Sequence, residues 1–478
     1  MKDLLLPISM PATHTLPHII QGGMGVAVSN WRLANAVSRA GQLGVVSGTG
    51  LDTVLVRRLQ DGDLGGHMRR ALERFPIPGV AQEVLARYFN PNGRVPGTPY
   101  KLLPMYKQVV SAARQRVTIL ANFVEVSLAK EGHDGPVGIN LLAKVQMPNI
   151  ASLYGAILAG VNVVLMGAGI PREIPGVLGA LAEHRPASMR FDVEGLAREE
   201  TELLRFDPLD YWASPPAALA RPQFIAIVAA ASLATTLARK SNGPVAGFVV
   251  EGPTAGGHNA PPRGELRLND RGEPVYGDRD IVDLAKLREL SLPFWLAGGV
   301  GSPEGRRAAH AAGAAGIQVG TLFAFCEESG LAPQLRQRVL DAVAAGAASV
   351  YTDPKASPTG YPFKIVQLRG EARRMERPRL CDIGYLRVPA RTGAGKIVYR
   401  CPAEPVEDYV RKGGVAADTV GRQCLCNGLI ASVGFPQHRA DGDEQPLVTS
   451  GDDLLRIPEF LGTRRRYTAT DVISYLLS

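Results

Sequence analysis

Residues 294–320 read FWLAGGVGSPEGRRAAHAAGAAGIQVG and contain one complete structural repeat. A short apolar run ends in two glycines at 298–299, and a helical pattern rich in alanine and arginine follows it. A second apolar run then begins at Gly316. This alternation predicts a strand, a helix and a second strand parallel to the first. Because the apolar runs carry almost no polar residues, we expect both faces of the sheet to be covered by helices.

The same unit recurs along most of the chain on either side of this stretch. Strands are expected at 19–23, 43–48, 137–142, 161–167, 223–229, 247–252, 294–299 and 316–320. Helical patterns are expected at 30–40, 149–159, 172–184, 232–240, 281–290, 303–312 and 333–345. Eight alternations predict an α/β fold of the closed (β/α)₈ TIM barrel type, because open doubly wound sheets usually have fewer strands.

Three stretches are too long for this minimal unit. Residues 51–132 predict a helical insertion, and residues 186–222, which include Trp212, predict a second insertion that acts as a lid over the site. The barrel domain is expected to cover residues 1–370, and residues 371–478 are expected to form a C-terminal, cysteine-containing appendage.

Composition narrows the class of protein. The chain has 478 residues, of which 45% are hydrophobic and 21% charged, with a formal net charge of +8. No basic block is interleaved with aromatic residues, so a nucleic-acid partner is not expected. The apolar runs are too short to cross a bilayer, so no membrane partner is expected. Residues 1–14 show no secretory signal pattern, and the five cysteines form no dense disulfide framework. We therefore expect a cytoplasmic protein, and the sequence leaves its oligomeric state open.

The turns after the last two expected strands point to a ligand. Ligands of this barrel bind where strands end and the following loops begin. Gly298 and Gly299 follow the seventh strand, and Gln318, Gly320 and Thr321 end the eighth. Glycine allows a ligand to approach the backbone, and a helix N-terminus offers free N–H groups to an anion. These two neighbouring turns predict a phosphate-binding corner, although a single glycine pair also occurs in turns for structural reasons alone.

A histidine follows the sixth expected strand, where a catalytic group is expected. The segment from Glu251 to His258 contains Gly256 and Gly257 directly before the histidine. The reference pKa of histidine, about 6.5, suits a general base at neutral pH. The histidines at positions 67, 133, 184 and 310 fall in helical or connecting stretches, and we expect them at the surface.

These residues resemble the nitronate monooxygenase family, formerly called 2-nitropropane dioxygenases. The resemblance rests on Gln21-Gly22-Gly23-Met24, Asn140, Gly256-Gly257-His258, Ala297-Gly298-Gly299 and Gln318-Val319-Gly320-Thr321, and it covers about residues 15–365. It implies an FMN-dependent oxidoreductase with the FMN phosphate at Gly298, Gly299, Gly320 and Thr321. It also implies Met24 and Asn140 near the isoalloxazine ring, and His258 as the base that removes the α-proton of a nitroalkane before reaction with oxygen. The flavin site as a whole is expected to comprise Gly22, Gly23, Met24, Asn140, Glu251, Gly256, Gly257, Gly298, Gly299, Gln318, Gly320 and Thr321.

The same superfamily contains flavin-type enoyl-acyl-carrier-protein reductases, and two features favour that alternative. Glu251 stands where nitronate monooxygenases usually have glutamine, and residues 351–360 depart from their Ser-Gly-Arg loop. That alternative implies an acyl-carrier-linked substrate in place of a small molecule, and NAD(P)H as reductant. A further alternative is a non-catalytic flavin-binding subunit or sensor, which the appendage would favour.

Four cysteines in the appendage raise the question of a metal. Cys381, Cys401, Cys424 and Cys426 lie in a segment that has little apolar material for a core of its own. Four thiolates could hold a structural zinc or an iron–sulfur cluster. Their spacing lacks paired C-x-x-C knuckles, so the equal alternative is that they are small buried side chains.

Overall fold

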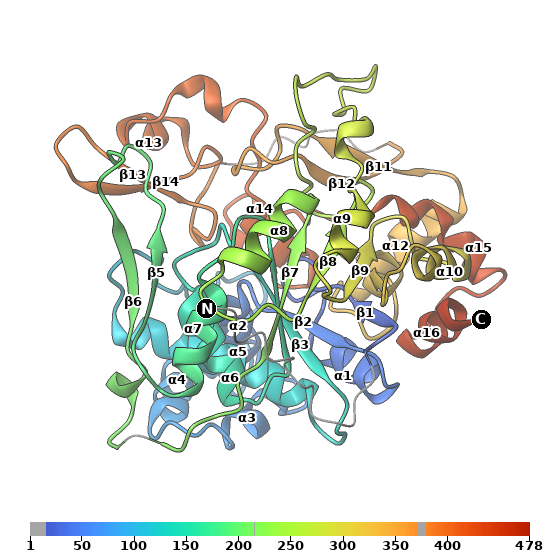
Figure 1. Cartoon of the computed structure of the whole chain (residues 1–478). Helices are drawn as coiled ribbons and strands as arrows, with labels where there is room; N and C mark the ends of the chain where they lie inside the picture. Colours follow the sequence, from blue (N-terminus) through green and yellow to red (C-terminus); the bar gives the residue numbers. More distant parts are fainter. Residues whose placement is uncertain (1–15, 215, 371–378) are drawn as a thin grey trace, which may run out of the picture.

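The computed structural model describes residues 16–214, 216–370 and 379–478. Its centre is an eight-stranded parallel sheet in the order β1-β10-β9-β8-β7-β4-β3-β2 (Figure 1). The strands are β1 Ile19–Gln21, β2 Gly44–Ser47, β3 Val137–Leu142, β4 Val163–Gly167, β7 Gln223–Val228, β8 Gly247–Glu251, β9 Phe294–Ala297 and β10 Gly316–Val319. All eight expected strands are confirmed, most of them one or two residues shorter than predicted.

Backbone contacts between the first and last strands of this order close the sheet into a barrel. Ile20 forms a parallel bridge with Leu43, and the Gln21 N–H donates to the Leu43 carbonyl at 2.9 Å. The buried Gln21 side chain adds to the closure, since its Oε1 accepts the Val45 N–H at 2.9 Å. The predicted TIM barrel is therefore the observed fold.

Alternation along each strand separates two apolar cores. One cluster consists of residues on alternate strand positions, namely Ile20, Leu43, Val45, Val163, Leu165, Ile225, Val249, Trp295 and Ala297. The intervening positions, such as Ile19, Val46 and Phe224, belong to a larger cluster shared with the helices. A strand buried on both faces has no polar side, which is why these runs are almost wholly apolar.

Helices follow the strands as the sequence predicts. They are α1 Trp31–Arg39, α6 Asn149–Leu158, α7 Ile174–Ala182, α8 Ala231–Lys240, α9 Leu284–Arg288, α10 Pro303–Ala311, α11 Thr321–Ala324 and α12 Pro333–Ala344. Several starts show their capping chemistry: the Asn30 side chain accepts the Leu33 N–H, and the Ser302 hydroxyl accepts the Gly305 N–H. One expectation about histidine is wrong, because His184 is buried and its Nδ1 lies 2.8 Å from the Tyr154 hydroxyl.

The helical insertion between β2 and β3 is confirmed. It contains α2 Leu51–Gln60, α3 His67–Leu72, α4 Val80–Tyr88 and α5 Ala112–Ala129. The long helix α5 packs against α1, α2 and α6, so the insertion extends the helical layer of the barrel.

The second insertion forms a hairpin, and the lid expected there is wrong. Strands β5 Ala187–Phe191 and β6 Glu202–Phe206 pair antiparallel, and a 3₁₀ turn, η1 Pro208–Tyr211, follows. The hairpin contacts α7 and bonds to the C-terminal region through the Glu194 N–H and the Pro389 carbonyl. None of the described residues of 186–222 lines the cavity at the barrel mouth, because the alternate buried side chains of β5 hold the hairpin against the barrel's side.

The described residues from 348 onward lie across the barrel mouth and along its flank. Their strands are β11 Ala348–Asp353, β12 Phe363–Leu368, β13 Val388–Arg391, β14 Ile397–Arg400, β15 His438–Arg439 and β16 Gly442–Asp443. Their helices are α13 Val406–Arg411, α14 Leu425–Ser432, α15 Ile457–Leu461 and α16 Ala469–Leu477, with 3₁₀ turns η3 Ala416–Thr419 and η4 Asp452–Arg456. Helix α16 packs against α1 and α10, which Figure 1 shows beside it. We call residues 379–478 the C-terminal layer.

Two sequence expectations fall outside the described residues: the secretory-signal reading of residues 1–14 and the domain boundary at 371. Within the described ranges, no helix is both long and apolar enough to cross a membrane.

Candidate functional site

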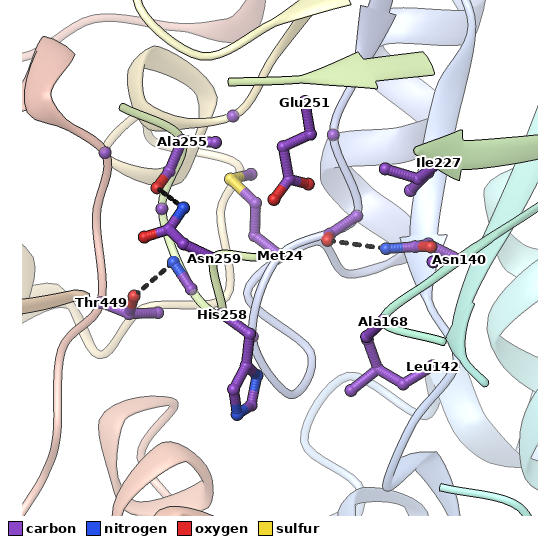
Figure 2. Close-up of a pocket in the computed structure, with 18 of the residues that line it drawn as sticks. Met24, Asn140, Leu142, Ala168, Ile227, Glu251, Ala255, His258, Asn259 and Thr449 are labelled. Carbon is purple, nitrogen blue, oxygen red and sulfur yellow. Dashed lines mark hydrogen bonds between the residues drawn. The ribbon is translucent and has the colours of Figure 1, made fainter. Parts of the chain in front are cut away.

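A cavity of about 470 Å³ lies at the carboxyl ends of the barrel strands, where this fold binds ligands. Every residue that the sequence assigned to the flavin site lines it, and so does His258. These residues are Gly22, Gly23, Met24, Asn140, Glu251, Gly256, Gly257, Gly298, Gly299, Gln318, Gly320 and Thr321. Figure 2 shows Met24 and His258, which lie on loops, together with Asn140 and Glu251, which lie on strands β3 and β8. The structure thus brings the predicted set together, while the role of each residue stays a prediction.

The glycine turns after β9 and β10 present unpaired donors. Within the described part of the chain, the N–H groups of Gly298, Gly299 and Gly320 donate to no protein acceptor. A Cβ at Gly298 would lie 2.9 Å from the Ala255 backbone nitrogen, so no side chain fits there. Three N–H groups without partners at the ends of two adjacent strands are suited to binding an anion.

The C-terminal layer closes this corner from outside. The Gly451 N–H donates to Thr321 Oγ1 at 3.0 Å, and the Gly301 N–H donates to Asp453 Oδ2 at 3.2 Å. Burial raises the pKa of the Asp453 carboxyl. The loop 449–453 therefore forms one wall of the cavity.

Two side-chain amides that line the cavity have free acceptors. Asn140 Nδ2 donates to the Gly23 carbonyl at 3.1 Å, and Figure 2 marks this bond. Asn140 Oδ1 and Gln318 Oε1 are buried and have no hydrogen-bond partner in the part of the chain that the structure describes. Buried polar atoms are normally paired, so these two acceptors call for donors on a ligand.

His258 is held at one edge of the cavity. Its Nε2 lies 2.7 Å from Ser357 Oγ, and its ring packs edge-on against Phe363. Burial, with a smaller effect of Lys144, holds the pKa of His258 well below its usual value. The imidazole is therefore neutral around pH 7, the state in which it can accept a proton.

Lys144 interacts electrostatically with both this histidine and Glu251. Burial raises the pKa of Glu251 to about 7 and lowers the pKa of Lys144 to about 7, and each charge partly offsets the shift of the other. Glu251 lines the cavity and Lys144 lies behind its wall, and two neighbouring groups that titrate near neutral pH mark a candidate functional site. Sequence reasoning missed Lys144, although its position two residues after the end of β3 is itself a signal.

Sequence reasoning also missed the outer wall. The C-terminal layer adds mostly apolar side chains to the cavity, namely Tyr385, Leu386, Leu425, Cys426, Leu429 and Ile430. These residues are more than fifty positions beyond the last barrel strand, and no motif marks them.

The sequence left open whether the four late cysteines hold a metal or are small buried side chains. All four line one small cavity, yet among residues 16–214, 216–370 and 379–478 no group of His, Cys, Asp and Glu is arranged to hold a metal ion. Burial raises the pKa of Cys381 to about 11 and raises the pKa of Cys401, Cys424 and Cys426 as well. Neutral buried thiols behave as small apolar side chains, which was the alternative prediction.

The fold and the site define a (β/α)₈ barrel with a ligand cavity lined by glycine turns and a buried histidine. Residues 129–352 match the family model of nitronate monooxygenase, which confirms the resemblance to that family over this region. The chain is 31% identical over 197 residues to the nitronate monooxygenase of Pseudomonas aeruginosa, covering 40% of this chain and 49% of that protein. It is 37% identical over 94 residues to a probable nitronate monooxygenase of Bacillus subtilis, covering 20% of this chain and 25% of that protein. The matches thus span half or less of the curated relatives.

Two solved structures are also similar. FabK from Thermotoga maritima is 18% identical with a TM-score of 0.44, covering 96% of this chain and 91% of that chain. A nitroalkane oxidase from Streptomyces ansochromogenes is 16% identical with a TM-score of 0.45, covering 96% of this chain and 94% of that chain.

Proposed function

We propose that this protein is an FMN-dependent oxidoreductase in which His258 exchanges a proton with the substrate. One observation carries the proposal: the His258 imidazole and the three unpaired glycine N–H groups line the same cavity. The first feature suits proton transfer, and the second suits the phosphate of a bound cofactor.

The residues present fit FMN. Gly298, Gly299 and Gly320 would hold its phosphate, and the free acceptors of Asn140 and Gln318 would pair with its polar ring edge. The bound flavin would supply the electron transfer that no side chain of the cavity provides. The sequence has a single phosphate corner, which favours FMN over a dinucleotide flavin.

The first candidate substrate is a nitroalkane or its nitronate, with oxygen as co-substrate. Support comes from the family match over residues 129–352 and from the neutral state of His258. A neutral imidazole can remove the acidic α-proton of a nitroalkane, and the carbanion so formed is the nitronate that the enzyme would oxidise.

The second candidate is an enoyl thioester reduced at the expense of NAD(P)H. Two observations favour it: Glu251 in place of the usual glutamine, and the apolar wall built by Leu386, Leu425 and Leu429. Such a wall suits an acyl chain better than a short nitroalkane. His258 would then protonate the substrate carbon instead of deprotonating it.

Mixing experiments in the absence of oxygen separate these candidates. The purified yellow protein, which should release FMN on denaturation, would be mixed with nitroethane, its nitronate, NADH or NADPH while flavin absorbance is followed. For the first candidate, His258→Asn should slow flavin reduction by nitroethane about 10²–10⁴-fold and affect the pre-formed nitronate far less.

The matched control is His310→Asn, which changes an exposed histidine outside the cavity and should leave both rates unchanged. Rapid bleaching by NADPH with no reaction toward nitronate would favour the enoyl reductase. A protein that releases FAD, or one whose flavin no compound reduces, would contradict the proposal and favour a non-catalytic subunit.

A further inference from the structure

A line of hydrogen bonds leaves the cavity at His258 and ends at a lysine behind the wall. His258 Nε2 lies 2.7 Å from Ser357 Oγ, which lies 2.8 Å from Thr359 Oγ1. Lys144 Nζ lies 3.3 Å from the same Thr359 hydroxyl. Of these four residues only His258 lines the cavity. Ser357 is buried behind the wall, and Thr359 and Lys144 continue the line to partly exposed positions.

The two hydroxyls in the middle of this chain are fixed in place. They lie on the loop between β11 and β12, where Asp353 Oδ1 accepts the N–H groups of Lys355 and Ala356. The Ser357 side chain is fully buried, its Oγ accepts the Thr359 N–H at 3.2 Å, and its carbonyl accepts a bond from Arg422. Hydroxyl groups held this way can only rotate their hydrogens, and each can donate in either direction along the chain.

The lysine at the far end is only partly exposed and yet has no ion pair among the residues that the structure describes. In the described part of the chain no carboxylate lies within ion-pair distance of Lys144 Nζ. The group instead lies 4.3 Å from the centre of the Tyr361 ring, and Glu251 and His258 are the titratable groups that it senses. Burial lowers the pKa of Lys144 to about 7, so both of its protonation states are accessible near neutral pH.

We propose that Lys144, acting through Thr359 and Ser357, sets which ring nitrogen of His258 carries the proton. A charged Lys144 can only donate, so Thr359 must donate to Ser357 and Ser357 to His258 Nε2. The ring hydrogen then sits on Nδ1, which has no partner among the described residues. A neutral Lys144 gains a lone pair and can accept, which allows every bond to reverse: Nε2–H donates to Ser357, Ser357 to Thr359, and Thr359 to Nζ. The lone pair then sits on Nδ1.

The two states give His258 opposite abilities. With neutral Lys144, Nδ1 accepts a substrate proton, Nε2 passes its own hydrogen to Ser357, and the shift along the hydroxyls leaves one extra proton on Lys144. With charged Lys144, the reverse shift delivers a proton from Nδ1 to the substrate and leaves a neutral amine. One proton moves in each direction and the imidazole is neutral before and after. Lys144 is therefore a positioning residue that also stores the transferred proton. This inference deepens the proposed function, since it assumes that His258 exchanges protons.

The tautomer of His258 can be read without any turnover. The full-length protein would be labelled with ¹⁵N in its histidine rings, and the His258 resonances assigned from their loss in His258→Asn. Nitrogen shifts distinguish a protonated ring nitrogen from one with a lone pair. In the wild-type protein we expect the proton to move from Nδ1 below about pH 6 to Nε2 above about pH 8, with a midpoint near the pKa of Lys144.

Four variants test the chain. Lys144→Met and Thr359→Val should abolish this pH-dependent exchange, and Lys144→Arg should keep the proton on Nδ1 throughout because arginine stays charged. The control is Lys364→Met, which removes another buried lysine that bonds to Thr352 and Asp452 outside the chain. It should leave the exchange unchanged.

The inference is overturned if the wild-type His258 keeps one tautomer from pH 6 to 8, or if Lys144→Met still exchanges. Failure of the proposed function looks different: the exchange persists while none of the nitro or nicotinamide compounds changes the flavin spectrum.

Discussion

The turn after β9 takes a left-handed backbone conformation twice in succession, with φ of +89° at Gly298 and +68° at Gly299. Side chains make this conformation costly, and glycine adopts it freely. The same turn presents the unpaired N–H groups described above. The glycines at 298 and 299 therefore determine both the backbone conformation of the turn and the access of a ligand to its N–H groups.

Gly299→Val should abolish flavin retention. A Cβ there would stand 3.1 Å from Thr254 Oγ1 and would enter the proposed phosphate corner. Gly346→Val is the matched control, because Gly346 has a similar φ of +63° with open space around its Cβ. Both variants carry the same kind of backbone strain, so flavin absorbance per chain after gel filtration isolates the effect on the site. Equal flavin loss in both would show that strain alone is responsible.

Glu251 should make the free energy of unfolding depend on pH. Its pKa is about 7 in the folded protein and near 4.5 when unfolded, so the folded state binds more protons between these values. Stability contributed by this group is therefore present below pH 4.5 and lost as the pH rises to 7. Glu251→Gln removes this pH-dependent loss. The free energy of unfolding of the variant minus that of the wild type should therefore increase by up to about 3 kcal/mol from pH 5 to pH 8.

Urea unfolding of the flavin-free proteins at the two pH values measures this difference. Glu407→Gln, at an exposed glutamate, should show no such change. A Glu251→Gln difference that is the same at pH 5 and pH 8 would contradict the buried-acid assignment. Lys144 has the opposite effect on the free energy of unfolding above pH 7, which it increases as the pH rises, because its folded pKa lies below its ordinary value of 10.5.

Among the elements, the contact between α5 and α6 joins the helical insertion to the barrel. An ideal Cβ on Gly155 of α6 would lie only 2.0 Å from the Ile119 carbonyl oxygen of α5. The two backbones can approach this closely only because the position has no side chain.

Gly155→Ala should therefore force the helices apart and destabilise the protein by about 1–3 kcal/mol or more. Gly179→Ala changes a glycine in α7 whose Cβ would meet only the Arg221 side chain, at 4.0 Å. That variant should be neutral or stabilising by roughly 0.5–1 kcal/mol, because alanine favours the helix. Urea unfolding midpoints compare the two, and a neutral Gly155→Ala would mean that the helices can separate without cost.

At the scale of the whole molecule, the C-terminal layer shares its core with the barrel. Ile430, Val433 and Leu454 belong to the same apolar cluster as the barrel helices. The Tyr467 hydroxyl donates to the Leu322 carbonyl at 2.7 Å, and an Arg57 guanidinium donates to the Phe435 carbonyl. These contacts predict that layer and barrel fold as one unit.

A fragment of residues 1–370 should accordingly be insoluble or fail to bind flavin, since it would expose the apolar surface that α14 and α16 cover. The full chain should unfold in a single calorimetric transition. A soluble, yellow fragment with a cooperative transition of its own would establish the layer as a separate domain.

Much of this organisation follows from local sequence. The eight strands were predictable because each is an apolar run ended by glycine or a polar residue. Both features are set by residues that are neighbours in the sequence. Four site residues were predictable because a barrel places the carboxyl ends of all its strands at the same mouth. They are His258, Gly298, Gly299 and Gly320.

What the sequence determined by itself is therefore the barrel and the residues at its strand ends. Only the tertiary structure decided the rest: the hairpin at 187–206 lies beside the barrel, the C-terminal layer walls the cavity, and Lys144 reaches His258 through Ser357 and Thr359. The physical reason is distance along the chain. Ser357 is 99 residues from His258 and Thr359 is 215 residues from Lys144, so no local pattern encodes these contacts. The neutral-range pKa values of Lys144 and Glu251 likewise arise from burial in the folded chain, which outweighs the attraction between their charges.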